Sequence, residues 1–179
     1  MSIQKGAAET RRLFFALWPE LDKQRELAKL AQAVLPTSSG KLVATENLHA
    51  TALFLGSVTA AQQLCVESAA SQVRAGPFTL TLDRVGYFRR PQVLWAGCRA
   101  LPPELLALVS GLRNGCAPCG MAVDDRPFEL HVTLVRHVRA DPGRPPVMPV
   151  SWEVSQFALV ESVSDAHGVH YQPLRCWAL

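Results

Sequence analysis

The chain has 179 residues, 49% of them hydrophobic, which is enough to bury a substantial core in one domain or two small, closely packed lobes. Its 18 basic and 15 acidic residues leave a net charge of +3, which argues against a protein that coats nucleic acid through charge alone. The N-terminus has no long uncharged apolar run, and the five cysteines have irregular spacings. We therefore expect a soluble cytoplasmic protein with reduced thiols and no membrane segment.

The first half of the chain predicts the order strand, helix, strand, helix. The aromatic run RRLFFALW, residues 11–18, is typical of a buried strand, and apolar residues at helical spacing follow over residues 20–35. LHATALFLG, residues 48–56, is the next strand candidate. A capping-box pattern then begins a helix predicted over residues 59–73.

The second half predicts more strands than helices. FTLTLDRVGYF, residues 78–88, and QVLWAGC, residues 92–98, are predicted to form one hairpin, and Pro102-Pro103 begins a third helix that ends at Gly115. Further strands are predicted over residues 128–138, 151–163 and 170–179. Strands outnumber crossover helices late in the chain, which predicts an α+β protein rather than a doubly wound parallel one.

A histidine–threonine motif occurs twice, as LHATA with His49 and Thr51 and as LHVTL with His131 and Thr133. In a strand, residues two apart point to the same face, so each copy presents its His and Thr together while the apolar residues between them face a core. The histidines are 82 residues apart (131 − 49), close to half the chain length. This repeat predicts two pseudo-symmetric halves whose four polar side chains face one cleft.

These residue types suit displacement at phosphorus. The attacking and leaving oxygens lie on opposite sides of the phosphorus atom, so one group must accept a proton while another donates one. Two imidazoles can do both, because imidazole titrates near neutral pH. Threonine hydroxyls can donate hydrogen bonds to the non-bridging oxygens. This chemistry needs neither a metal nor a cofactor, so we expect none.

Five segments in order, RRLFFALWP, ENLHATALFLG, VGYFRRPQVLWAG, RPFELHVTLVR and a W-x-V-x-x-F-x-L-V-x-S stretch over residues 152–162, resemble the 2H phosphodiesterase superfamily. The similarity is specifically to the RNA 2′,3′-cyclic phosphodiesterase or 2′-5′ RNA ligase (LigT-like) family, and it covers nearly the whole chain. It implies one bilobal domain over residues 1–179, with a flexible tail over residues 1–10. Two lobes of antiparallel sheet with outer helices would enclose a central cleft.

The resemblance also implies the reaction: hydrolysis of an RNA 2′,3′-cyclic phosphate to a 2′-phosphate. His49 would be the proton donor and His131 the proton acceptor, while Thr51 and Thr133 would hold the phosphate. The expected partner is RNA with a cyclic-phosphate end, including tRNA-like fragments, or a cyclic nucleotide, and the expected state is a monomer. Two alternatives stay open: 2′-5′ RNA ligation by the reverse reaction, and a module that binds RNA ends or cyclic nucleotides without turnover.

Two further residues carry over from the family pattern: Arg136 as a phosphate contact and Phe54 as a base-stacking surface. Each lies five residues after a motif histidine, so strict alternation places it on the opposite face. Both reach the cleft only if their strands twist or bulge. The sequence departs from the family at Ala50 and Ala52, where leucines are usual, and at Leu130, where proline is common.

A zinc site is arithmetically possible on the pair Cys116-Ala-Pro-Cys119 and His167-Gly-Val-His170. The two histidines are closer together than zinc-finger spacing requires, which disfavours the site. The sequence therefore predicts no metal ligands, and it predicts that these cysteines are loop and surface residues.

Overall fold

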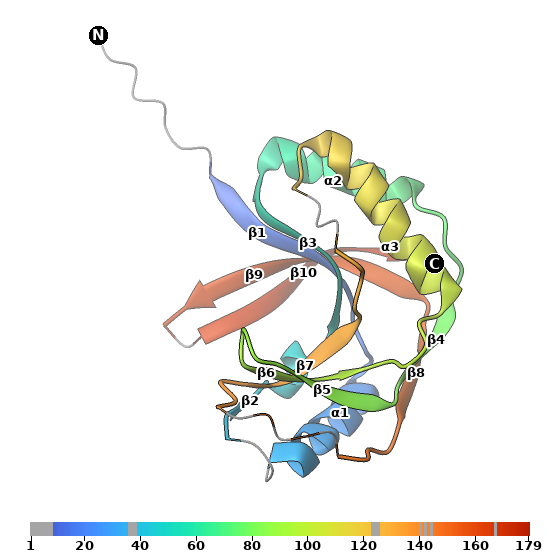
Figure 1. Ribbon diagram of the computed structural model, residues 1–179. Helices are drawn as coiled ribbons and strands as arrows, with labels where there is room; N and C mark the ends of the chain where they lie inside the picture. The colour runs from blue at the N-terminus through green and yellow to red at the C-terminus, as the bar shows by residue number, and fades with distance from the viewer. Residues whose placement is uncertain are drawn as a thin grey trace.

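The computed structural model describes residues 9–35, 39–122, 126–139, 141, 143, 145–166 and 168–179. The predicted tail lies outside this description through residue 8, and Thr10 already belongs to the first strand. The elements in chain order (Figure 1) are β1 (Thr10–Leu17), α1 (Leu21–Val34), β2 (Lys41–Leu42), η2 (Thr45–Asn47), β3 (Ala50–Thr59), α2 (Ala60–Gln72), β4 (Phe78–Leu82), β5 (Arg84–Phe88), β6 (Val93–Gly97), α3 (Pro103–Cys116), η3 (Ala117–Cys119), β7 (His131–Arg136), β8 (Val150–Val154), β9 (Gln156–Asp165) and β10 (Gly168–Ala178).

The predicted α+β class with antiparallel strands is confirmed. One eight-stranded sheet has the order β10-β9-β1-β3-β7-β6-β5, with β2 also paired to β7. Its two halves meet where β3 pairs with β7, at Ala50 opposite Val132. The two strands that carry the histidine–threonine motif therefore lie side by side at the centre of the sheet. None of the helices in the described part of the chain has the length and apolar content needed to span a bilayer.

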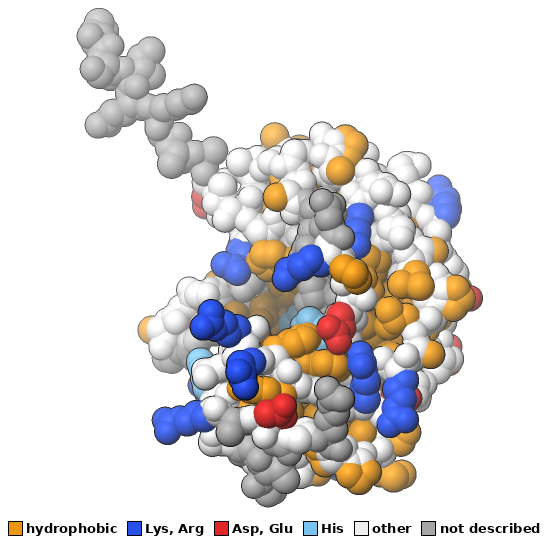
Figure 2. All heavy atoms as spheres, viewed as in Figure 1, with side chains coloured by type: hydrophobic (Ala, Val, Ile, Leu, Met, Phe, Trp, Pro, Cys, Tyr) orange, Lys and Arg blue, Asp and Glu red, His pale blue; other side chains and the backbone are white. Residues whose placement is uncertain are grey.

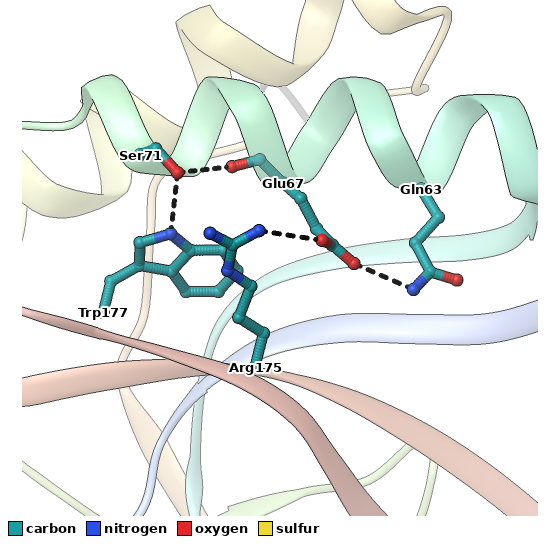
Figure 3. Close-up of polar contacts among 5 residues, drawn as sticks. All are labelled: Gln63, Glu67, Ser71, Arg175 and Trp177. Carbon is teal, nitrogen blue, oxygen red and sulfur yellow. Dashed lines mark hydrogen bonds and ion pairs between the residues drawn. The ribbon is translucent and has the colours of Figure 1, made fainter.

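Helices cover one face of each half of the sheet (Figure 1). α2 and α3 pack beside β3, whereas α1 and the small sheet β4–β8 lie with the half that contains β7. Figure 3 shows how α2 is joined to β10: Trp177 Nε1 donates a hydrogen bond to Ser71 Oγ at 2.9 Å, and Arg175 pairs with Glu67 at 3.2 Å. These contacts fix β10 against the helical layer.

Alternate residues of β1 pack into two different apolar clusters, so this strand is buried on both faces. Leu13, Phe15 and Leu17 join the main core with the inner faces of the helices. Phe14 and Ala16 belong to a second, smaller cluster on the opposite face of the sheet. The other members and neighbours of that second cluster are Ala158, Val160, Trp18 and Tyr171.

Two predicted strands are each divided in the structure. Residues 78–88 form β4 and β5, and residues 151–163 lie in β8 and β9. The first strand of each pair leaves the main sheet: β4 pairs with β8 in a separate two-stranded sheet. The single long hairpin strand predicted over 78–88 is therefore wrong, and only β5 pairs with β6. At the first break, Asp83 accepts a hydrogen bond from Arg99 N at 2.9 Å. At the second, the Ser155 carbonyl accepts one from Leu179 N at 2.9 Å.

The predicted capping box at the start of α2 is confirmed. Thr59 Oγ1 accepts a hydrogen bond from Gln62 N at 3.3 Å, and Gln62 Oε1 accepts one from Thr59 N at 3.0 Å. The predicted end of the third helix at Gly115 is wrong, because α3 continues to Cys116 and the chain turns at Gly120, which has φ 75°. Gly115 is instead a packing residue.

The prediction of reduced thiols is confirmed for Cys98, Cys116 and Cys176, which are free, and is wrong for the other two cysteines; the predicted surface position is wrong for Cys116. Cys65 of α2 and Cys119 form a disulfide, while Cys116 is buried in α3. Small residues of α3 allow the two helices to approach closely: a Cβ on Gly115 would lie 3.2 Å from the Cβ of Ala69. This approach brings the two thiols together. It also removes Cys119 from the zinc hypothesis, whose His167 lies outside the described residues.

Candidate active site

The four motif side chains line one cleft of about 1550 Å³. His49 immediately precedes β3, His131 begins β7, and the register sets Ala50 opposite Val132. In an antiparallel pair this register puts His49 toward Thr133 and Thr51 toward His131. Figure 2 shows the hollow from the outside, with histidine inside it and basic side chains around it.

Each histidine is oriented by the carbonyl of the residue two positions before it. His49 Nδ1 lies 2.7 Å from Asn47 O, and His131 Nδ1 lies 3.0 Å from Glu129 O. A carbonyl oxygen can only accept a hydrogen bond, so in both rings Nδ1 carries the hydrogen. The Nε2 atom is then the one that can accept or donate a proton during a reaction.

The His49 ring lies among three aromatic side chains. Trp18 stacks on it with centroids 4.9 Å apart and planes 6° apart, Phe14 lies 5.1 Å away, and Tyr171 presents an edge at 4.8 Å. Burial is the main cause that lowers the pKa of His49 to about 4; the hydrogen bond to the Asn47 carbonyl opposes this lowering, and the nearby charges of Arg136 and His131 add to it. His49 is therefore neutral in the unliganded protein at neutral pH.

His131 has a different environment, formed by the β5–β6 hairpin. Phe88 contacts its ring edge-on with centroids 5.1 Å apart, and the Trp95 ring lies 6.3 Å away. Trp95 is buried beneath the guanidinium of Arg84, which lies 5.0 Å from the indole centroid. The two histidines thus have separate sets of aromatic neighbours, one from each half of the sheet.

A bulge in each motif strand turns the fifth residue after the histidine toward the cleft. One extra residue, Ala52 in β3 and Leu134 in β7, interrupts the pairing with the neighbouring strand. Such an extra residue inverts the alternation that follows it. Phe54, 48% exposed, and Arg136 therefore line the same cleft as the histidines. The guanidinium of Arg12 lies 5.0 Å from the centroid of the Phe54 ring.

Several residues around His49 were not predicted from the sequence. Arg136 donates a hydrogen bond to the Tyr171 hydroxyl at 3.5 Å, and Asn47 Nδ2 donates one to the Val169 carbonyl at 3.1 Å. β10 thereby contacts both the turn that orients His49 and the arginine beside it. A further bulge, at Leu174, lets β10 present Tyr171 to the cleft and Trp177 to the helices. No local sequence pattern marks these long-range contacts.

The cleft has a strong excess of positive charge. Its basic lining residues are Arg12, Lys41, Arg90, Arg113, Arg126 and Arg136. Glu129 is the one acidic residue in the described lining, so the excess is five (6 − 1), larger than the net +3 of the whole chain. Such a cleft favours an anionic ligand, and arginine can bind two phosphate oxygens at once.

Comparison with known proteins agrees with this geometry. Residues 16–166 match the model of the 2'-5' RNA ligase superfamily. The chain is 35% identical to the Escherichia coli RNA 2',3'-cyclic phosphodiesterase, covering 96% of this chain and 98% of that protein. It is 31% identical to the protein of the same name from Thermus thermophilus, covering 94% and 90%.

Solved structures give the same result. Escherichia coli LigT complexed with 3'-AMP has a TM-score of 0.89 at 35% identity, with 96% of this chain and 99% of that chain covered. A Thermus thermophilus protein, TT0787, has a TM-score of 0.76 at 30% identity, covering 94% and 97%. The chain belongs to the 2'-5' RNA ligase superfamily.

Proposed function

We propose that the protein hydrolyses RNA 2′,3′-cyclic phosphate ends to 2′-phosphomonoesters, with His49 as the proton donor and His131 as the proton acceptor. The observation that carries this proposal is the pair of equivalent Nδ1–carbonyl contacts, which leave two Nε2 atoms for proton transfer at the centre of one basic cleft. The relatives named RNA 2',3'-cyclic phosphodiesterase support the substrate.

In the proposed reaction, water attacks phosphorus while the bond from phosphorus to the 3′ oxygen breaks. His131 Nε2 accepts the proton of the attacking water, and His49 Nε2 donates a proton to the departing 3′ oxygen on the opposite side. The products are a 2′-phosphate and a free 3′-hydroxyl. These two proton transfers account for the chemistry without a metal ion.

The remaining site residues act on the phosphate and the base. Thr51 and Thr133 donate hydrogen bonds to the non-bridging oxygens, and Arg136 adds a charged contact. Phe54, held beneath Arg12, provides the surface on which a nucleobase stacks.

The low pKa of His49 adds a requirement to this mechanism. A proton donor must be protonated when the 3′ oxygen departs, yet a pKa of about 4 leaves His49 neutral in the free protein. A bound anionic phosphate raises the pKa of a neighbouring imidazole, because it stabilises the charged form. We therefore infer that His49 gains its proton together with the substrate.

The biological setting follows from the substrate and remains a prediction. RNA ends with a cyclic phosphate, including tRNA-like fragments, and cyclic nucleotides are the proposed substrates. We expect the protein to act on them in the cytoplasm as a monomer.

The test is incubation of the protein with a short RNA that ends in a 2′,3′-cyclic phosphate, with excess chelator present. We expect a 2′-phosphate product, and we expect His49→Ala and His131→Ala each to reduce turnover by roughly two orders of magnitude or more. His170→Ala is the matched control, because His170 lies near Asp165 outside the cleft lining. Full activity in either cleft variant, or activity lost with chelator and restored by zinc, would contradict the mechanism.

A further inference from the structure

The buried face of α1 contains one polar residue. Gln24 is only 6% exposed and lies among the apolar side chains that attach the helix to the core. Its buried neighbours on the helix are Leu27, Leu30, Ala31 and Val34. A buried amide without hydrogen-bond partners destabilises a fold, so buried polar groups are nearly always paired. The partners of the Gln24 amide therefore indicate its role.

These partners are backbone carbonyls beside the first catalytic histidine. Gln24 Nε2 donates one hydrogen bond to Glu46 O at 3.3 Å and another to Leu48 O at 3.4 Å. Because a carbonyl oxygen only accepts, the amide nitrogen must be the atom that faces them. Both carbonyls belong to the segment that directly precedes His49. Gln24 thereby joins α1 to this segment across 22 and 24 positions of the chain.

The turn η2 leaves these carbonyls without partners of its own. Two backbone hydrogen bonds close η2, from Asn47 N at 2.9 Å and from Leu48 N at 3.2 Å, and both end on carbonyls one turn earlier. The last carbonyls of a helical segment have no partner within it. Here these are the carbonyls of Glu46, Asn47 and Leu48, and side chains supply the donors. Gln24 binds the first and the third, and His49 Nδ1 binds the second.

We propose that Gln24 is a positioning residue for His49. Its amide fixes the two carbonyls on either side of Asn47, so that the Asn47 carbonyl is held toward Nδ1 and Nε2 faces the cleft. This inference rests on the proposed function, because Gln24 serves the reaction only through the proton that His49 donates. Gln24 does not belong to the described lining of the cleft, so it acts through His49 and not on the substrate.

The orientation of the Asn47 carbonyl decides which ring nitrogen can react. Neutral imidazole carries one hydrogen, and the nitrogen that faces a carbonyl keeps it. With Asn47 O 2.7 Å from Nδ1, the basic lone pair lies on Nε2, where the proton for the leaving oxygen has to be held. The same hydrogen bond raises the pKa of His49 and so opposes the effect of burial. A relaxed turn would admit the other tautomer, whose basic nitrogen points away from the cleft.

The start of α1 supports His49 from two directions. Gln24 N donates a hydrogen bond to the Glu20 carbonyl at 2.9 Å, which places Gln24 in the first turn of the helix. Trp18, two residues before Glu20, stacks on the His49 ring with planes 6° apart. The indole restricts the plane of the ring, and Gln24 fixes the turn whose carbonyl holds Nδ1. Together they limit the imidazole to one orientation.

The test removes the amide at nearly constant volume. Gln24→Met has no donor for the two carbonyls, so kcat for an RNA with a 2′,3′-cyclic phosphate end should fall at least about ten-fold as the imidazole loses its fixed orientation. KM should change less than about two-fold, because the substrate contacts of the cleft remain. Gln24→Asn, whose amide is one carbon too short to reach the carbonyls, is the second variant and should show the same loss.

Nitrogen NMR of the imidazole separates positioning from stability. The chemical shifts of the two ring nitrogens show which one carries the hydrogen, and the His49 signals are those that disappear in His49→Gln. At neutral pH we expect the hydrogen on Nδ1 in the wild type and a mixture of both tautomers in Gln24→Met. The signals of His131, whose Nδ1 is held by the Glu129 carbonyl instead, should stay unchanged.

Two controls match the change without touching the turn. Gln63→Met removes a glutamine amide from α2 together with its hydrogen bond to Glu67 at 2.8 Å (Figure 3). Leu27→Ala removes core packing from α1 itself, three residues after Gln24. Assayed where each protein is folded, both should keep the kcat and the ring spectrum of the wild type, although Leu27→Ala lowers the urea midpoint.

Other outcomes separate the two proposals. Wild-type kcat in both Gln24 variants, an unchanged ring spectrum in Gln24→Met, or an equal loss of kcat in Leu27→Ala would overturn the positioning role while the hydrolase stands. A wild-type protein that does not hydrolyse the cyclic phosphate would overturn the proposed function, and the catalytic purpose of Gln24 with it.

Discussion

Lowering the pH should destabilise the protein through His49. The pKa of this residue falls from 6.5 to about 4 on folding, mainly because the ring is buried among Trp18, Phe14 and Tyr171. Between these two values the unfolded chain binds a proton that the folded chain does not, so the free energy of unfolding decreases as the pH falls. The difference between a pKa of 6.5 and one of about 4 corresponds to about 3 kcal/mol.

The measurement compares the wild type with His49→Gln, which has a similar polar side chain and does not titrate. Urea unfolding followed by circular dichroism gives the free energy of unfolding of each protein at a series of pH values. The contributions of all other titrating groups largely cancel in the difference between the two proteins. We expect the advantage of the wild type to be complete above about pH 6.5 and to shrink by about 3 kcal/mol down to about pH 4.

A flat difference would refute this account of the site. If the wild type and His49→Gln lose stability in parallel over that pH range, burial does not hold the imidazole neutral. The inference that His49 gains its proton with the substrate would then lose its basis.

Three further outcomes are expected. Saturating inorganic phosphate should raise the pKa of His49 from about 4, as followed by NMR of its ring, and an unchanged titration would place the phosphate elsewhere. Tyr171→Phe removes the hydroxyl that accepts a hydrogen bond from Arg136. KM for a cyclic-phosphate RNA should then rise about five-fold, corresponding to about 1 kcal/mol, with kcat nearly constant. An unchanged KM would show that Tyr171 does not position Arg136 for the substrate. Cys65→Ser should lower the free energy of unfolding by at most about 4 kcal/mol, since the disulfide joins residues separated by 54 positions. Excess reductant should remove the difference in stability between the wild type and this variant. A difference that persists in reductant would have a cause other than the disulfide.

The sequence predicted correctly those elements that are determined by neighbouring residues in the chain. The helical spacing of α1 and the capping box of α2 depend on residues within a few positions of one another, and both elements are found where expected. The divided strands have a different origin. The apolar and polar residues continue to alternate through Asp83, so the sequence there does not reveal that β4 and β5 pair in different sheets.

The sequence predicted the part of the candidate site that is formed by the repeated histidine–threonine motif. The two motifs identify their histidines and threonines, and the structure places all four in one cleft. The bulges that turn Phe54 and Arg136 inward also leave a trace, because each strand has two consecutive buried apolar residues after its threonine: Ala52-Leu53 and Leu134-Val135. That pair breaks the alternation in both copies.

Contacts between distant segments could not be read from the sequence. Tyr171 reaches His49 across 122 positions (171 − 49), and Trp18 lies beyond the end of β1. The disulfide depends on the packing of α2 against α3, which brings Cys65 and Cys119 together, whereas five cysteines at irregular spacings do not look like a disulfide framework in the sequence.

Because Ala50 pairs with Val132, the distance between the two histidines is set by the main chain. Each imidazole is held by its own strand and by a backbone carbonyl, and the two strands are joined by backbone pairing. The side chains of Ala50 and Val132 point into the buried core and do not set this distance. Substitutions that change the volume of the core should therefore lower the stability of the fold before they move the reacting atoms. The positions of the two imidazoles should tolerate changes in the core residues packed behind β3 and β7.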